Sequence, residues 1–171
     1  MDDGLTGRED SVRADQEKSR EYLARALVLE SVQAARNEIA ALKAHAEGRN
    51  AEEKLFRAME QAQRVHWNKA LMLLRGRTGS TDENLEQTLA SLQQSLSSYM
   101  AMLENTDGPA RGMADQLVRT TRNHMVLVRQ VASRPPGTYH VCGICGFIAY
   151  DQAPERCPVC RALQEKFAVV D

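Results

Sequence analysis

The sequence predicts a mainly α-helical protein, in which an antiparallel four-helix bundle is followed by a small cysteine-rich domain with short β-strands. Three observations lead to this fold class. Glycine and proline divide residues 17–133 into four segments with the apolar periodicity of helices. All four cysteines fall between positions 142 and 160. One Trp, four Tyr and three Phe among 171 residues are too few for an aromatic-rich β-sandwich.

The chain divides into four parts by composition. Residues 1–17 are charged and aperiodic, which predicts a flexible N-terminal arm. Residues 18–134 carry the helical pattern of the bundle. Residues 135–138 begin with two prolines and a glycine, which cannot continue a helix and therefore predict a linker. Residues 139–171 form the cysteine-rich domain.

The four helices are expected near residues 17–47, 50–75, 81–105 and 109–133. Two of the starts carry the spacing of a capping box, in which a polar side chain caps the helix and an acidic residue three positions later caps it in return. These pairs are Asn50 with Glu53 and Ser80 with Glu83.

In three of these helices, polar residues interrupt the apolar stripe, or seam, that is expected to face the bundle interior. They are Glu30 in the first helix, Gln63 and His66 in the second, and His124 in the fourth. Burying such groups without a partner costs several kcal/mol, roughly, so they are expected to meet one another, water or a metal ion. They form the candidate bundle site.

This candidate bundle site can be compared with bundles that hold two iron ions. Such bundles use a Glu from each of two helices and Glu-x-x-His from each of the other two. The chain keeps Glu30 and both histidines, but Gln63, Leu92 and Thr121 stand where three of the four glutamates are needed. One carboxylate cannot offset the charge of two iron ions in a bundle interior. The residues therefore favour a metal-free polar cluster, with a single metal ion on Glu30, His66 and His124 as the alternative.

The strongest motif is the pair of C-x2-C sequences in the last part of the chain. It consists of Cys142, Cys145, Cys157 and Cys160, with eleven residues between the two pairs. Each C-x2-C sequence is expected to form a tight turn, called a knuckle below. Two knuckles place four thiolates around one tetrahedral ion, and a domain this short needs that crosslink to fold. A metal site is favoured over disulfides, but zinc and iron both suit four thiolates. The glycine at position 146 permits the turn that directs backbone N–H groups at sulfur.

The sequence around these cysteines closely resembles the rubredoxin domain that ends rubrerythrins. The resemblance rests on YHVCGICGFI at 139–148, CPVC at 157–160 and EKF at 165–167. The segments LESVQA at 29–34 and 56–66 also resemble ligand-bearing helices of that family. The resemblance implies a ferritin-like bundle over 18–134 and a rubredoxin-like domain over 139–171 that carries one iron on the four cysteines. It also implies dimers, and peroxide reduction at a di-iron centre in the bundle.

The chain departs from the family at several positions. Gln63, Leu92, Ser95 and Thr121 replace iron-binding glutamates, which argues against di-iron catalysis and leaves enzymatic activity open. Arg161 replaces the glycine usual after the second knuckle. A cation beside the thiolates favours the more negative reduced site, so Arg161 is expected to raise the reduction potential.

Three functions follow as expectations. The first is a one-electron redox protein with a rubredoxin-type iron, or zinc as purified, and no di-iron centre in its bundle. The second is a peroxide-reducing or other oxidoreductase with a single metal or cofactor held by the bundle. The third is a non-catalytic interaction module with structural zinc.

Charge and hydropathy restrict the partners and the compartment. The 22 basic and 23 acidic residues nearly balance, so a nucleic-acid partner is not expected. No run of about eighteen apolar residues and no secretion signal occur, which predicts a cytoplasmic protein without membrane spans. The expected partners are a second copy of the chain and redox proteins.

Overall fold

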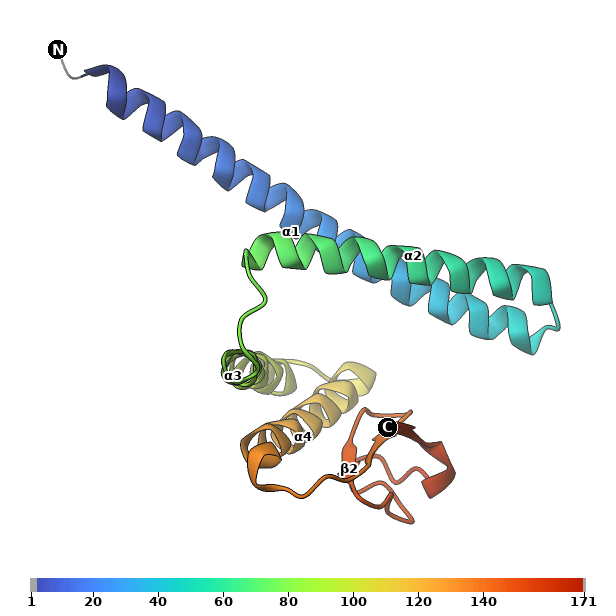
Figure 1. Cartoon of the computed structure of the whole chain (residues 1–171). Helices are drawn as coiled ribbons and strands as arrows, with labels where there is room; N and C mark the ends of the chain where they lie inside the picture. The colour runs from blue at the N-terminus through green and yellow to red at the C-terminus, as the bar shows by residue number, and fades with distance from the viewer. Residues whose placement is uncertain (1–2, 171) are drawn as a thin grey trace. The chain divides into compact units, whose positions relative to one another are not determined.

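The computed structural model describes residues 3–170, with side chains described from residue 13 onward (Figure 1). It consists of two compact units, residues 1–78 and residues 79–171. Each unit contains one helical hairpin, and the second also contains the cysteine-rich domain.

The first unit is an antiparallel hairpin of helix α1 (Asp3–Ala46) and helix α2 (Asn50–Arg75). The two helices run side by side in Figure 1, and a short turn at 47–49 joins them. Small residues dominate their contact, because the buried apolar positions among the described side chains of this hairpin are all alanines. These are Ala34, Ala41, Ala44 and Ala70. Alanine lets two helices approach closely but buries little apolar area, so this hairpin has a thin core.

Helix α1 begins earlier than the sequence predicts. Residues 3–17, expected to form a flexible arm, are the first turns of this helix, while residues 1 and 2 lie outside the described residues. Residues 13–22 are exposed, so packing does not hold this end in place. The segment lacks apolar periodicity, but it also lacks proline, and its Arg, Glu and Gln residues propagate a helix that has already formed downstream.

The capping box predicted for Asn50 with Glu53 does not form at the start of α2. Arg49, rather than Asn50, holds the N-cap position, and it makes no side-chain capping bond. Glu53 contacts Arg57 and His45 instead of closing a capping box. The acidic residue therefore joins the two helices at this end of the hairpin by bonding one side chain on each.

The second unit begins with helix α3 (Thr81–Asn105) and helix α4 (Gly108–Gln130), which extends into the short 3₁₀ helix η1 (Val131–Ser133). Its predicted capping box is confirmed. Ser80 Oγ accepts from the Glu83 N–H at 3.1 Å, and Glu83 Oε2 accepts from the Ser80 N–H at 2.7 Å. Pro109 in the first turn of α4 costs no hydrogen bond, because that N–H has no helical partner.

A small antiparallel sheet follows residues 134–138, which have no helix or strand. Its strands are β1 (Tyr139–Cys142), β2 (Ile148–Tyr150) and β3 (Phe167–Val170), in the order β2-β1-β3. The 3₁₀ helix η2 (Gln164–Lys166) leads into β3. The unit boundary lies at 78/79 rather than at the linker, because α4 packs against β2 within one compact unit.

The predicted fold class is confirmed. Four long helices in two antiparallel hairpins precede a small sheet that carries the four cysteines. Among the described residues, no helix combines the length and the apolar character that crossing a membrane requires.

Candidate metal centre

The four cysteines lie on two knuckles with matching backbone geometry. In the first, the Cys142 N–H donates to the Phe147 carbonyl at 2.9 Å, and the Gly146 N–H donates to the Cys142 carbonyl at 2.9 Å. In the second, the corresponding bonds join Cys157 to Ala162 at 2.8 Å and Arg161 to Cys157 at 3.0 Å. The C-x2-C sequence therefore forms the same hydrogen-bonded turn twice.

In each knuckle, the residue directly after the second cysteine has a positive φ, in the left-handed region of backbone conformation. Gly146 has φ 75° and Arg161 has φ 67°. Glycine adopts this conformation without a penalty, whereas a residue with a Cβ adopts it at a cost of roughly 1–2 kcal/mol. The predicted turn at Gly146 is present, and Arg161 occupies the equivalent position under strain.

The two knuckles bring all four sulfur atoms together. The Sγ atoms lie within 4.8 Å of one another, with 3.7 Å between Cys142 and Cys160 and 3.5 Å between Cys145 and Cys157. None of them is in a disulfide. Four thiolates about 2.3 Å from a central ion form a tetrahedron with edges of about 3.8 Å. The donor set therefore fits one tetrahedral metal ion, as the spacing predicts, and it is the one such cluster among the described residues.

Burial raises the pKa of Cys145, Cys157 and Cys160, whereas backbone hydrogen bonds to their sulfur atoms lower it. Burial raises the pKa of Cys145 despite a bond from the Phe147 N–H, and it likewise raises the pKa of Cys160. Burial also disfavours ionisation of Cys157, but the N–H groups of Cys160 and Val159 bond its sulfur and lower its pKa to about 7. Of these three thiols, Cys157 therefore forms a thiolate most readily, and it is completely buried.

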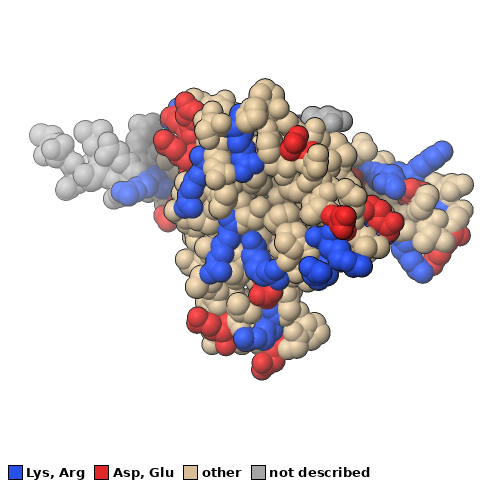
Figure 2. Space-filling model, turned by 90° about the horizontal axis from the view of Figure 1, so that it is seen from below, with Lys and Arg blue, Asp and Glu red and all other residues tan. Residues whose placement is uncertain are grey.

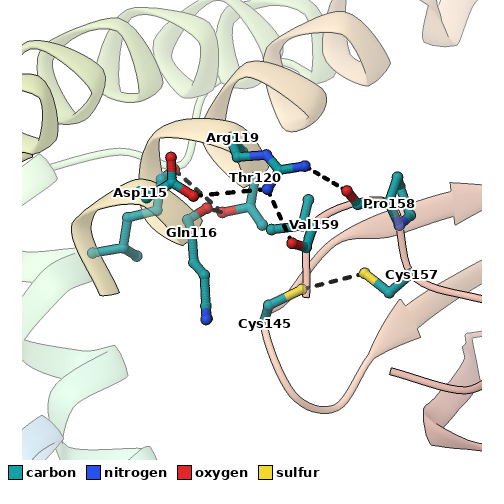
Figure 3. A network of polar contacts seen from close by, with 9 residues as sticks. Asp115, Gln116, Arg119, Thr120, Cys145, Cys157, Pro158 and Val159 are labelled. Carbon is teal, nitrogen blue, oxygen red and sulfur yellow. Dashed lines mark hydrogen bonds and ion pairs between the residues drawn. The ribbon is translucent and has the colours of Figure 1, made fainter. Parts of the chain in front are cut away.

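Helix α4 contacts both knuckles through three side chains. His124 Nε2 lies 2.9 Å from the Gly146 carbonyl oxygen in the first knuckle. Asn123 Oδ1 accepts from the Ile148 N–H at 3.1 Å, where β2 begins. Arg119 contacts the second knuckle, as Figure 3 shows. Sequence reasoning missed Arg119 and Asn123. Their spacing of four residues puts them on one helical face, but spacing cannot indicate what that face contacts.

The first unit brings two of the predicted bundle-site residues together. His66 Nδ1 lies 3.1 Å from Glu30 Oε2. Gln63 is buried and joins two side chains of α1, since its Oε1 accepts from Asn37 at 2.8 Å and its Nε2 donates to Gln33 at 3.4 Å. Glu30 and Gln63 thus have polar partners on the facing helix of their own hairpin.

His124 belongs to the second unit, where its Nε2 bonds the Gly146 carbonyl of the first knuckle. Its place in the inward seam of the bundle stays a prediction. Because a carbonyl oxygen only accepts, Nε2 carries the proton. His124 also borders an apolar cavity of about 330 Å³, and Leu92 lines the same cavity. None of the nine described lining residues carries a carboxylate, and Thr121 is buried on the same helix.

Comparisons with known proteins agree with the cysteine motif. Residues 140–168 match the family model of the rubrerythrin rubredoxin-like domain. No curated protein matches the chain. Solved structures of nigerythrin are similar, in the partially reduced state with 19% identity and TM-score 0.47, and in the fully reduced, all-ferrous state with 18% identity and TM-score 0.47. Each alignment covers 88% of this chain and 86% of the other. Residues 140–168 therefore form a rubredoxin-like domain of the kind found in rubrerythrins.

Proposed function

We propose that the protein is a one-electron redox protein whose four cysteines hold a single iron ion. The observation that carries this proposal is the convergence of four sulfur atoms within 4.8 Å, on two equivalent knuckles of a rubredoxin-like domain. Iron held by four thiolates exchanges one electron between its ferrous and ferric states.

The residues around the sulfurs support electron exchange at one side of the site. Cys142 and Cys157 are 1% and 0% exposed, whereas Cys145 and Cys160 retain contact with solvent. Ile144, beside Cys145, is 60% exposed. We infer that a redox partner approaches over Ile144, because an exposed apolar side chain next to accessible sulfur excludes water when it is covered.

We also propose that the helical hairpins hold no di-iron centre. Leu92 occupies a glutamate position of the di-iron template and lines an apolar cavity together with His124. Glu30 pairs with His66, and Gln63 bonds Asn37 and Gln33. These contacts support a polar cluster that needs no metal charge to balance it.

Iron content tests the main proposal. Protein produced with added iron under low oxygen is expected to be red, to bleach with dithionite and to contain about one iron per chain. Anomalous scattering above and below the iron and zinc edges should locate that iron at the four sulfurs. A Cys160→Ser variant serves as the control that loses the spectrum. A colourless preparation with stoichiometric zinc under these conditions would support the structural-zinc alternative instead.

The Glu30–His66 contact favours a second candidate, an oxidoreductase with a single metal ion held in the first unit. Peroxide turnover coupled to an electron donor tests it. His45→Ala is a matched control for His66→Ala, because His45 also pairs with a glutamate at similar distance, 3.0 Å to Glu53. Turnover that His66→Ala abolishes and His45→Ala retains would establish the second candidate and overturn the metal-free assignment.

Three further proposals concern assembly, partners and compartment. We propose a homodimer, since large apolar side chains of the first hairpin are exposed, among them Ile39 at 67% and Leu73 at 66%. Light scattering should report twice the chain mass.

Figure 2 shows basic and acidic side chains intermixed on the face in view, which supports a protein redox partner rather than nucleic acid. The unpaired cysteines support a reducing compartment such as the cytoplasm.

A further inference from the structure

The side chain of Arg119 on α4 binds the backbone of the second knuckle at two points. Its Nη1 donates to the Val159 carbonyl at 3.0 Å, and its Nη2 donates to the Pro158 carbonyl (Figure 3). Pro158 and Val159 are the two residues between Cys157 and Cys160. The planar guanidinium therefore spans both peptide groups inside the C-x2-C turn, a geometry that lysine cannot reproduce.

The same two peptide groups donate hydrogen bonds to a sulfur. The Pro158 carbonyl shares its peptide with the Val159 N–H, and the Val159 carbonyl shares its peptide with the Cys160 N–H. Both of these N–H groups bond the sulfur of Cys157. Hydrogen bonds arranged in series polarise one another, so a cation at the carbonyl end makes the N–H end a stronger donor. Arg119 is thus linked to the Cys157 sulfur through two peptide groups, each of which accepts from the guanidinium at its carbonyl and donates to sulfur at its N–H.

Arg119 is itself held by its own helix. Asp115 Oδ2 lies 3.7 Å from Arg119 Nη1, one helical turn away. The Arg119 side chain is 43% exposed, so solvent and salt screen part of its charge. Asn123, one turn further along α4, bonds the start of β2. With His124, which bonds the Gly146 carbonyl, the helix therefore holds the cysteine-rich domain at three places, and Arg119 is the contact from α4 that brings a permanent charge.

We propose that Arg119 is a positioning residue that holds the second knuckle on α4 and raises the reduction potential of the metal site. An iron with four thiolates carries a charge of −1 when oxidised and −2 when reduced, so a nearby cation stabilises the reduced state more. The positioning part needs only a metal in the site, whereas the effect on the potential rests on the proposed function.

The zinc-loaded protein tests positioning without any redox chemistry. Amide hydrogen exchange at Val159 and Cys160 is measured in the native protein, in Arg119→Gln and in Arg122→Gln. Arg122 is the matched control, because it lies on the same helix and contacts Met100 Sδ at 3.9 Å. We expect exchange about tenfold faster in Arg119→Gln, since a charged hydrogen bond is lost, and unchanged exchange in Arg122→Gln.

The iron-loaded protein tests the potential by voltammetry at low and high salt. Arg119→Gln should have a lower potential than Arg122→Gln, although both lose one positive charge. Asp115→Asn should raise the reduction potential, because it removes the negative charge that partly offsets the Arg119 guanidinium. Both shifts should shrink at high salt.

Either measurement can overturn the proposal. Equal exchange rates in the two arginine variants would contradict the positioning role, and equal potentials would contradict the effect on the reduction potential. Protein that takes up no iron, or shows no reversible couple, would contradict the proposed function instead, and the exchange measurement on zinc protein would still decide whether Arg119 holds the knuckle.

Discussion

The Nε2 atom of His124 lies 2.9 Å from the carbonyl oxygen of Gly146, the residue that follows Cys145. A helix side chain therefore binds the first knuckle of the metal centre directly. Since Arg119, five residues earlier, binds the second knuckle, both halves of the site are attached to α4. Five residues place the two side chains more than one helical turn apart, which matches two knuckles lying side by side along the helix.

Replacing His124 should loosen the attachment of the first knuckle. His124→Ala is expected to lower the free energy of unfolding of the zinc-loaded protein by about 1 kcal/mol, the usual net value of one hydrogen bond. Urea unfolding followed by tyrosine fluorescence measures the change. His66→Ala is the control, because the exposed pair of His66 with Glu30 is worth less. Equal losses in the two variants would contradict the attachment.

Arg161→Gly should change both stability and potential. Glycine removes the strain at φ 67°, which predicts a gain of roughly 1 kcal/mol in the free energy of unfolding. It also removes a cation near the thiolates, so the reduction potential should fall. Thermal unfolding and voltammetry measure the two effects. An unchanged or higher potential would show that Arg161 does not act on the site electrostatically.

Gly146→Ala is the reverse experiment in the first knuckle. A Cβ at Gly146 would meet nothing within 4 Å, so no clash is expected. The cost should therefore come from φ 75° alone, about 1 kcal/mol of lost stability. Thermal unfolding of the metal-loaded protein measures it. Gly112→Ala in α4 provides the control, since it also has open space around its Cβ but no positive φ, and it should stabilise the protein slightly.

Metal removal should unfold the cysteine-rich domain while leaving the helices of the first unit formed. The buried residues of this domain are few, namely Cys142, Ala149 and Cys157 among the described ones. Without the ion, so small a core cannot offset the conformational entropy of the domain. A strong chelator should collapse the amide dispersion of residues 139–170 in NMR spectra and change helical circular dichroism only slightly. Retained dispersion would contradict this expectation.

Glu53 should make stability depend on pH in the acid range. Hydrogen bonds from Arg57 and then His45 lower the pKa of Glu53 below its ordinary value of 4.5. A carboxylate with a depressed pKa stabilises the fold above its unfolded pKa, and this contribution disappears as the pH falls through the folded value. Glu53→Gln should therefore be less stable than the native protein at pH 7, and the difference should shrink as the pH falls below 4.5 and vanish once it is below the depressed folded pKa of Glu53.

The pairing that lowers the pKa of Glu53 can be checked separately. Arg57→Gln removes the larger cause, so NMR titration of the Glu53 carboxyl should show a higher pKa. A pKa unchanged by this substitution would contradict the assigned partner.

Local patterns in the sequence determined the helices of the fold and the ligands of the metal site. Apolar periodicity and chain breakers predicted all four helices, and Ser80 with Glu83 formed the predicted capping box. The C-x2-C spacing predicted the tetra-cysteine cluster, because a knuckle closes through hydrogen bonds only a few residues apart. These features depend on neighbours along the chain, so their residues suffice to predict them.

Only the tertiary structure decided which way polar side chains face. Asn50 has the residue type of a helix cap, but Glu53 pairs with Arg57 and His45. His124 has the spacing of a bundle ligand, but it binds the first knuckle. Arg119 looks like an ordinary surface cation, yet it binds the second. Each of these side chains has several competing partners of similar energy, and the packing of distant segments determines which partner is within reach.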